Sequence, residues 1–376
     1  METQRVIVAM SGGVDSSVAA LLLKEQGYEV IGMTLRLWTS EDEDGNIASD
    51  SRCCSVEDVE DARNVCNLLK IPHYYVNFEK EFQEHVVDYF VNSYNSGRTP
   101  HPCLACNDKI KFDFLLRRAL FLNADFIATG HYARLVKNDS TVKLFKGIDQ
   151  GKDQTYVLYT LKQAELSRLK FPVGNHTKDR IREIAQEANL PVADKPDSQE
   201  ICFIPSGNYG EFLKDRVEAK PGVFVDKEGN ELGKHPGIQF FTIGQRRKLG
   251  LQSINGDAMF VLNIDSDTKQ ITLGAEEDLY EREFLCSGLS FTHDGYEKDK
   301  LKINARIRYK AKDVPAEVSV TNDVGTVCFD DAQRAITPGQ PVVFYRDEEM
   351  IGGGIIEASI RNSSKGLNER LSPVSL

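Results

Sequence analysis

The sequence predicts an α/β protein with a doubly wound parallel sheet at its N-terminus, a small, mostly β central domain and a C-terminal β-barrel. Strand and helix patterns alternate through about the first 200 residues, which is typical of a parallel sheet covered on both faces. From about Pro205, Gly and Pro become frequent and helical spacing fades. From Glu281 to Glu357 nearly every segment has a short strand pattern, as in a small barrel. The predicted domains are 1–204, 205–280 and 281–360, with a disordered tail over 361–376.

The N-terminal elements follow from hydrophobic periodicity. Apolar runs bounded by turn residues predict buried strands, and apolar residues at helical spacing predict helices. The predicted strands are Arg5–Met10, Glu29–Leu37, His73–Phe78 and Asp125–Thr129. The predicted helices are Val14–Gln26, Ser55–Leu69, Lys80–Tyr94 and Asp108–Leu122. The apolar face of the first helix is expected to hold Val14, Val18, Leu21 and Leu22, and the acidic segment Thr39–Arg52 is expected to be a mobile loop.

The C-terminal region carries an alternating run of cations. Its predicted strands are Lys302–Lys312, Glu317–Thr321, Gly325–Phe329, Pro341–Tyr345 and Met350–Glu357. Because side chains alternate along a strand, one face of the first strand would carry Arg306, Arg308, Lys310 and Lys312. Together with the cluster Gln245–Lys248, these residues are candidates for binding an RNA backbone. A solvated charged face is the alternative interpretation.

Composition sets broad limits. With 376 residues, 41% hydrophobic and 27% charged, the chain is expected to be an ordinary soluble protein of two or three domains. No apolar run is long enough to span a bilayer, and the first strand pattern leaves no room for a signal peptide, so we expect a cytoplasmic protein without a membrane partner. The net charge of −11 weighs against a nucleic-acid partner, although a local basic face can exist in an acidic protein.

The segment Ser11–Ser16, Ser-Gly-Gly-Val-Asp-Ser, lies between the first predicted strand and helix. Its two glycines would let the backbone approach a phosphate, and the helix N-terminus would hold the anion. There is no Gly-Lys-Ser/Thr, which disfavours a Walker-type site. The segment resembles the PP-loop of ATP pyrophosphatases, which split ATP to pyrophosphate while adenylating a carbonyl or carboxyl oxygen. A plain glycine-containing turn is the alternative.

The eight cysteines are not expected to form a disulfide framework in the cytoplasm. Cys106 is predicted just before a helix N-terminus, a position that lowers a thiol pKa, and its spacing from Cys103 also suits a metal or a redox pair. Cys202 alone would be a small buried residue, but with Cys106 it could form the donor and resolving thiols of sulfur transfer. Cys66, Cys286 and Cys328 are expected in the core, and no role is assigned to Cys53 and Cys54.

Two further groups of polar residues are candidates for the site. Gly130 and His131 follow a predicted strand directly, so they should lie at the same sheet edge as the glycine-rich loop. A structural role is the alternative for the histidine. Lys152, Asp153 and Gln154 form a polar turn that could contact a phosphate or a base, or be merely solvated.

These features together resemble the bacterial tRNA-specific 2-thiouridylases, which install sulfur at the wobble uridine of certain tRNAs. The resemblance covers nearly the whole chain. Its motifs are Met10–Ser16, Gly97–Pro100, Cys106–Asn107 with Ile110–Phe112, Ala128–Tyr132, Lys152–Gln154, Glu200–Ile204, Thr242–Arg246, Arg308–Tyr309 and Thr337–Gln340.

The resemblance implies roles for individual residues. Contacts to ATP are implied for Ala9, Met10, Ser11, Gly12, Gly13, Val14, Asp15, Ser16, Leu35 and Gly130. The target base would be bordered by His101, Pro102 and Cys103, and tRNA would be contacted by His131, Lys152, Asp153, Gln154, Arg308, Tyr309 and Gln340. Cys106 would be the nucleophile and Cys202 the persulfide carrier. A common form of the family has Asp at position 103, and the set Cys103, Cys106 and Cys202 could instead hold a [4Fe-4S] cluster.

The implied reaction uses ATP and Mg²⁺ to adenylate the C2 oxygen of uridine, followed by attack of a Cys202 persulfide; an order in which Cys106 attacks first is the alternative. The implied partners are tRNAs for glutamate, glutamine and lysine and a cysteine desulfurase or sulfur relay, with the protein itself a monomer.

Two rival functions stay open. One is a PP-loop ligase or amidotransferase for a small molecule, similar to argininosuccinate or GMP synthetases. The other is a non-catalytic iron–sulfur or RNA-binding protein.

Overall fold

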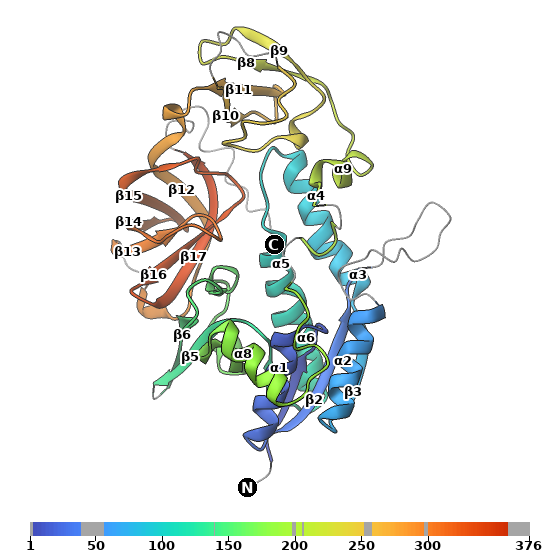
Figure 1. Ribbon diagram of the computed structural model, residues 1–376. Coiled ribbons are helices and arrows are strands. Elements are labelled where there is room, and N and C mark those ends of the chain that lie inside the picture. The colour runs from blue at the N-terminus through green and yellow to red at the C-terminus, as the bar shows by residue number, and fades with distance from the viewer. Residues whose placement is uncertain are drawn as a thin grey trace. The chain divides into compact units, whose positions relative to one another are not determined.

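The computed structural model describes residues 3–38, 56–138, 140–197, 201–204, 207–251, 258–296 and 300–359 (Figure 1). The chain divides into two compact units. The first comprises Met1–Val86, Cys103–Gly207 and Glu348–Met350, and the second comprises Val87–Pro102, Asn208–Asp347 and Ile351–Leu376. The expected mobile loop Thr39–Arg52, the pair Cys53–Cys54 and the expected disordered tail 361–376 lie outside the described residues.

The first unit is built on a five-stranded sheet with the order β3-β2-β1-β4-β7. All its neighbouring strands are parallel. The strands are β1 (Arg5–Ala9), β2 (Glu29–Arg36), β3 (His73–Asn77), β4 (Phe126–Ala128) and β7 (Leu169–Lys170). Val6, Ile7 and Val8 of β1 are fully buried, and because successive side chains point to opposite faces, both faces of the sheet are covered. This confirms the predicted doubly wound α/β fold.

Three helices share one apolar core with β1. They are α1 (Val14–Glu25), α2 (Val56–Leu68) and α8 (Lys178–Glu187), and their buried residues pack with Val6 and Val8. In α1, Val14 and Val18 are buried as predicted. Leu23 is also buried, whereas Leu21 and Leu22 are only partly buried and pack at the edge of the core. The first unit also contains the antiparallel hairpin of β5 (Ala133–Asn138) and β6 (Thr141–Lys146), which the sequence analysis missed.

Two predicted helices contain π-helical turns. The helix expected over Lys80–Tyr94 consists of α3 (Glu79–Phe82), the π-helix η1 (Gln83–Val87) and α4 (Asp88–Asn95). The helix expected from Asp108 begins earlier and consists of α5 (Pro102–Ala105), the π-helix η2 (Cys106–Phe114) and α6 (Leu115–Phe121). Its earlier start is explained by Pro102, since proline is favoured at the first position of a helix. The shorter elements of the first unit are η3 (Thr155–Val157), α7 (Gln163–Leu166) and η4 (Pro172–Asn175).

The second unit contains a small sheet with its own core. Its strand order is β10-β11-β8-β9, and its buried residues include Phe224, Ile238 and Ile271. The strands are β8 (Gly222–Val225), β9 (Glu231–His235), β10 (Phe260–Ile264) and β11 (Gln270–Gly274). The short helices of this unit are α9 (Tyr209–Lys214), η5 (Ile238–Phe240), η6 (Glu277–Leu279) and η7 (Asp294–Tyr296). The mostly β character of this region is as predicted.

A closed barrel follows. Its strands are β12 (Tyr280–Phe291), β13 (Leu301–Arg306), β14 (Val314–Thr321), β15 (Val324–Arg334), β16 (Pro341–Arg346) and β17 (Glu349–Ser359). They run in the order β12-β15-β14-β13-β16-β17, and pairing of β12 with β17 closes the ring. Phe284, Val327, Phe329 and Phe344 are fully buried inside it. The predicted C-terminal β-barrel is confirmed.

The predicted stripe of four cations on one strand is wrong. The strand β13 ends at Arg306, and the chain then turns, with the amide of Ala311 donating to the carbonyl of Arg308 at 3.0 Å. Arg306 is buried and donates to Asp313 at 2.6 Å, with its guanidinium 4.9 Å from the ring of Tyr345. This cation therefore belongs to the barrel core and is not part of a surface stripe.

Two other expectations concern cysteines and membranes. Cys66 and Cys286 are buried as expected, but Cys328 on β15 is exposed, because it lies on the outward side of its strand. Within the described ranges, no helix is both long and apolar enough to cross a membrane.

Candidate active site

The glycine-rich loop joins β1 to α1 at the carboxyl end of the parallel sheet. Gly12 has a φ of +72°, and a Cβ there would lie 2.3 Å from the carbonyl oxygen of Asp58. Gly13 is the N-cap of α1, and no side chain caps this end. The amides of the first helical turn therefore lack a side-chain acceptor, which is the arrangement that binds phosphate groups.

Gly130 lies against this loop from the neighbouring strand. A Cβ at Gly130 would lie 2.8 Å from the amide nitrogen of Ser16 and 2.9 Å from the carbonyl carbon of Asp15. The close approach follows from the parallel pairing of β1 with β4, which brings their carboxyl ends to one edge. Leu35, the other expected ATP contact outside the loop, is buried in β2.

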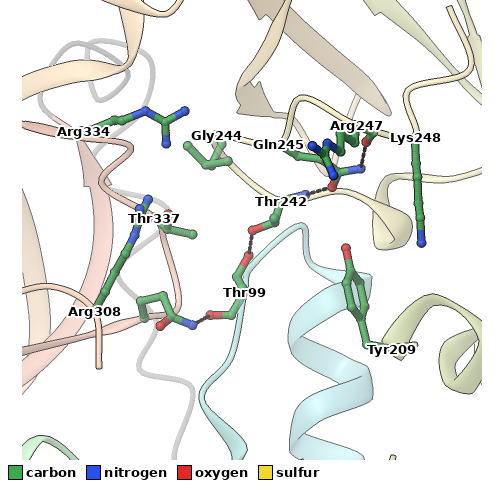
Figure 2. Close-up of a pocket in the computed structure, with 12 residues that line it drawn as sticks. Thr99, Tyr209, Thr242, Gly244, Gln245, Arg247, Lys248, Arg308, Arg334 and Thr337 are labelled. Carbon is green, nitrogen blue, oxygen red and sulfur yellow. Dashed lines mark hydrogen bonds between the residues drawn. The ribbon is translucent and has the colours of Figure 1, made fainter. Parts of the chain in front are cut away.

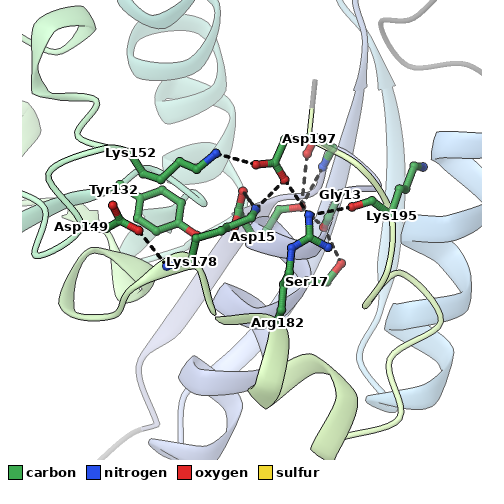
Figure 3. Close-up of polar contacts among 12 residues, drawn as sticks. Gly13, Asp15, Ser17, Tyr132, Asp149, Lys152, Lys178, Arg182, Lys195 and Asp197 are labelled. Carbon is green, nitrogen blue, oxygen red and sulfur yellow. Dashed lines mark hydrogen bonds and ion pairs between the residues drawn. The ribbon is translucent and has the colours of Figure 1, made fainter. Parts of the chain in front are cut away.

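A network of charged side chains lies beside the loop (Figure 3). The carboxylate of Asp15 accepts hydrogen bonds from the Tyr132 hydroxyl at 2.7 Å and from Lys178 Nζ at 2.8 and 2.9 Å. The Lys178 side chain is only 9% exposed, and its Nζ also lies 2.8 Å from Asp197. Asp197 additionally accepts from Lys152 at 2.8 Å and from Arg182 at 3.1 Å. Three cations and two carboxylates thus meet beside the α1 N-terminus.

The network shifts the pKa values of two of its members, Asp197 and Tyr132. Burial raises the pKa of Asp197, but hydrogen bonds and charges from Lys152 and Lys178 outweigh it and lower that pKa to about 2. Burial and the nearby charge of Asp15 raise the pKa of Tyr132, so this phenol stays protonated and donates to Asp15. At neutral pH, Asp197 is therefore an anion held by cations.

The thiols are arranged differently from the sequence-based expectation. Cys106 is half-buried and is the first residue of the π-helix η2, inside a helical segment that begins at Pro102. It does not precede the helix, so the predicted lowering of its thiol pKa by a helix N-terminus has no structural basis. Cys103, in the first turn after Pro102, is the cysteine nearest that N-terminus. Isolated π-helical turns are frequent at functional sites.

Cys103 and Cys202 lie close enough for their charges to interact. Cys103 is exposed, and partial removal from water together with the nearby Cys202 raises its pKa to about 11. The positive charge of Lys111 on η2 acts in the opposite direction on Cys103. Lys111 also interacts with His131. The structure thus brings two of the three candidate thiols together near one lysine.

The other predicted contacts of the first unit have structural partners. His131 is buried, its Nδ1 lies 2.6 Å from the Thr129 hydroxyl, and burial holds its pKa well below the ordinary value. Asp153 is buried and accepts from Thr155 at 2.9 Å. Gln154 accepts from the amide of Tyr132 at 2.9 Å. Of the Lys152–Gln154 turn, only Lys152 reaches the charge network.

Of the predicted contacts of the second unit, Arg308 and Gln340 line a pocket within that unit. The rings of His101 and Tyr309 lie 6.2 Å apart, and burial lowers the pKa of His101 to about 4. Gln340 donates to the carbonyls of Thr99 at 2.9 Å and Pro100 at 3.2 Å. Arg308 donates to the carbonyl of Ala335 at 2.7 Å.

This pocket has a volume of about 590 Å³ and is basic (Figure 2). Its lining joins Arg247 and Lys248, from the predicted basic cluster, to Arg308 and Arg334. Thr99, Thr242, Thr337 and Gln340 supply neutral polar groups, and the hydroxyls of Thr99 and Thr242 are 2.5 Å apart. Cations and hydroxyl groups in one cavity are suited to phosphate.

No three His, Cys, Asp or Glu side chains in the described ranges are arranged to hold a metal ion. Cys103, Cys106 and Cys202 all lie within those ranges, and the iron–sulfur alternative stays a prediction. The site residues that sequence analysis missed are Lys178, Arg182 and Asp197 of the charge network, together with Arg334 of the basic pocket. Asp197 lies three residues before the motif Glu200–Ile204, whereas the other three lie in no recognisable pattern.

Comparison with known proteins gives three family models along the chain. They are the tRNA methyl transferase HUP domain over residues 4–206, the tRNA methyl transferase PRC-barrel domain over 210–275 and the aminomethyltransferase beta-barrel domain over 281–356.

Curated relatives match over nearly the full length. A tRNA-specific 2-thiouridylase MnmA of Clostridium perfringens is 47% identical over 95% of this chain and 99% of its own. The enzyme of the same name from Carboxydothermus hydrogenoformans is 48% identical over 94% of this chain and 98% of its own. That from Clostridium botulinum is 49% identical over 95% and 99%. This chain therefore belongs to the tRNA-specific 2-thiouridylase family.

Proposed function

We propose that this chain catalyses the ATP-dependent 2-thiolation of uridine at the wobble position of tRNA, releasing AMP and pyrophosphate. The observation that carries the proposal is that one compact unit contains both the uncapped, glycine-rich start of α1 and the cysteines Cys103, Cys106 and Cys202. Replacing a carbonyl oxygen by sulfur through a persulfide uses an activating nucleotide, a thiol that carries the sulfur and a second thiol that releases it. The curated relatives carry the name of this activity.

The proposed ATP site is the edge of the parallel sheet. Its residues are Ala9, Met10, Ser11, Gly12, Gly13, Val14, Asp15, Ser16, Leu35 and Gly130. The triphosphate would lie against the first turn of α1, where Gly12 and Gly13 permit close approach. Fixed amide dipoles at that turn would stabilise the pyrophosphate as it departs, because they need no reorganisation during the reaction.

The proposed reaction has three steps. The C2 oxygen of uracil attacks the α-phosphorus of ATP, the bond to pyrophosphate breaks, and the oxygen becomes a good leaving group. The terminal sulfur of a persulfide on Cys202 then attacks C2, and AMP leaves with the former carbonyl oxygen. Finally the Cys106 thiolate attacks the Cys202 sulfur, the sulfur–sulfur electron pair passes to the thiocarbonyl of 2-thiouridine, and a Cys106–Cys202 disulfide remains. A thiol reductant must reopen this disulfide.

We assign Mg²⁺ to the same site. Mg²⁺ takes oxygen ligands, usually substrate phosphates with one or two carboxylates, and the Asp15 carboxylate in the first turn of α1 is 31% exposed, with Tyr132 and Lys178 as its present partners. The residues therefore fit the ion, which would neutralise charge on the departing pyrophosphate when it is bound. No other residue is assigned to a metal.

The proposed tRNA contacts come from both units. His101, Pro102 and Cys103 are assigned to the target base, and His131, Lys152, Asp153, Gln154, Arg308, Tyr309 and Gln340 to other parts of tRNA. Because burial keeps the His101 imidazole neutral, it could stack on a flipped base without a charge penalty.

The chain is proposed to be a cytoplasmic monomer with domains over 1–204, 205–280 and 281–360. Its proposed substrates are the tRNAs for glutamate, glutamine and lysine, and its proposed sulfur source is a cysteine desulfurase or a sulfur relay.

The test combines the purified chain with ATP, Mg²⁺, a persulfide donor, a thiol reductant and unmodified tRNA transcript. After nuclease digestion, nucleosides are analysed by mass spectrometry for 2-thiouridine. We expect thiolation by the wild type and none by Cys106→Ser or Cys202→Ser, while pyrophosphate release persists in both variants. Cys328→Ser, which removes an exposed thiol of the barrel, is the matched control and should retain full activity.

The same experiment separates the rivals. Normal 2-thiouridine yield from both Cys106→Ser and Cys202→Ser would refute the proposed sulfur transfer. Pyrophosphate release at an unchanged rate without RNA would favour a ligase or amidotransferase for a small molecule. Absence of pyrophosphate release even with tRNA would favour a non-catalytic binding protein.

A further inference from the structure

Asp197 occupies a position in the charge network that resembles that of a bound anion. One of its carboxylate oxygens lies 2.8 Å from Lys178 and 3.1 Å from Arg182, and the other lies 2.8 Å from Lys152 (Figure 3). Cations that converge on one carboxylate from three directions can also hold a phosphate group, which offers more oxygen acceptors and more charge. The cluster lies beside the N-terminus of α1, because Lys178 also binds Asp15 of the loop.

The two carboxylates of the network differ in how firmly they are held. Asp15 belongs to the first turn of α1 and also accepts from the Tyr132 hydroxyl. Asp197 lies in an irregular segment, whereas exposure does not separate the two carboxylates, since the Asp197 side chain is 24% exposed and that of Asp15 is 31% exposed. Lys178 is fixed at the start of α8, where its backbone amide donates to Asp149 at 2.9 Å. Asp197 has more cationic partners than Asp15, but its backbone lies outside any helix or strand, so it is the member that can move aside as an anion enters.

We propose that Asp197 is an internal competitor of the nucleotide, holding Lys178 and Lys152 until the triphosphate of ATP takes them. This inference rests on the proposed ATP site and adds two phosphate-binding cations to it, namely Lys178 and Lys152, the latter in place of the tRNA contact proposed for it above. Asp197 lowers the affinity for ATP, because each binding event must first break its ion pairs. When the nucleotide is absent, Asp197 shares the nearly buried Lys178 with Asp15, so two carboxylates compensate its charge.

A purely structural role for Asp197 predicts the opposite sign. If its carboxylate only pins Lys178 and Arg182 in place, removing the charge disorders the cations and weakens nucleotide binding. If it competes with the nucleotide, Asp197→Asn tightens binding, because the cations are then available. The direction of the change in affinity therefore distinguishes the two roles.

The experiment measures binding of a non-hydrolysable α,β-methylene ATP analogue with Mg²⁺ to the full chain by isothermal titration calorimetry. We expect Asp197→Asn to bind at least about 5-fold more tightly than the wild type, the lower end of typical coupling between linked sites. We expect Lys178→Met and Lys152→Met each to bind at least about 5-fold more weakly. Asp194→Asn is the matched control, because Asp194 lies in the same segment, is exposed and accepts a hydrogen bond from the Gln186 amide.

Lys152→Met guards against a folding failure of Lys178→Met, since the Lys152 side chain is 41% exposed. In the Lys152→Met background, Asp197→Asn should have a smaller effect, because one of the two competed cations is gone. Unchanged or weaker binding by folded Asp197→Asn overturns the inference.

Inorganic tripolyphosphate serves as a second probe. If it binds more tightly to Asp197→Asn while the ATP analogue binds to neither protein, the anion competition stands and the proposed ATP function fails. If the analogue binds to both proteins with equal affinity, the proposed function stands and the competition fails.

Discussion

The contact between Gly130 and the start of α1 gives a prediction whose size follows from the coordinates. In Gly130→Ala, the new methyl carbon would lie 2.8–2.9 Å from the Ser16 amide nitrogen and from two carbon atoms of Asp15. Ordinary carbon contacts begin at about 3.5 Å, so this turn of α1 must retreat by roughly half an ångström. Overpacking of this kind costs about 1–3 kcal/mol. In a domain of this size, each kcal/mol lowers Tm by about 2–4 °C, so we expect a fall of roughly 2–12 °C.

The retreat should affect nucleotide binding as well as stability, because the displaced backbone carries the amides assigned to phosphate. The assay is thermal unfolding by circular dichroism together with titration of the ATP analogue. Gly151→Ala is the control, since its nearest neighbour would be the Asp149 carboxylate oxygen at an ordinary 3.4 Å. A Gly130→Ala protein with the Tm and analogue affinity of the wild type would falsify this reasoning.

Three further outcomes are expected. Arg306→Ala should lower the free energy of unfolding in urea by about 3–5 kcal/mol, because it leaves Asp313 without its partner in the barrel. Lys300→Ala, which breaks an exposed pair, should lower it by only about 0–1 kcal/mol. Similar losses in the two variants would argue against a structural role for Arg306. The thiolate of Cys103 forms only as pH approaches its raised pKa of about 11, so its alkylation by iodoacetamide should still be accelerating above pH 9. A plateau below that pH would contradict the raised pKa. If the basic pocket binds tRNA phosphates, Arg247→Ala should reduce the slope of the logarithm of the tRNA binding constant against the logarithm of salt concentration by about one phosphate contact. Lys227→Ala, which lies outside the pocket, should leave this slope unchanged. Equal slopes for the wild type and both variants would exclude a phosphate contact of Arg247.

The loop and its sheet could be predicted because local signals agree there. A continuous apolar run around Val6–Val8, two adjacent glycines and a helical pattern from Val14 each indicate the same arrangement. The sequence predicts the helix that carries Cys106 only from Asp108, whereas in the structure it begins at Pro102. The first turn after Pro102 is too short to have a periodicity of its own. The β5–β6 hairpin did leave a signal, namely the turn residues Asn138–Ser140 between alternating segments.

Other features depend on contacts that no local pattern encodes. The alternation from Arg306 to Lys312 is a good strand signal, but pairing of Arg306 with Asp313 requires the chain to turn instead. Lys178 meets Asp15 across 163 residues of sequence, so only the folded sheet reveals that they share a site. The basic pocket similarly combines Thr99, Arg247 and Arg334 from distant segments.

The way the barrel closes has a consequence for its biogenesis. The last strand of the ring is β17 (Glu349–Ser359), and it pairs with both β12 and β16. Because a ribosome makes the chain from its N-terminus, β12 and β16 each have an unsatisfied edge until β17 emerges. Exposed strand edges invite pairing with other chains. During translation, the nascent barrel is therefore most vulnerable to aggregation just before its final strand leaves the exit tunnel.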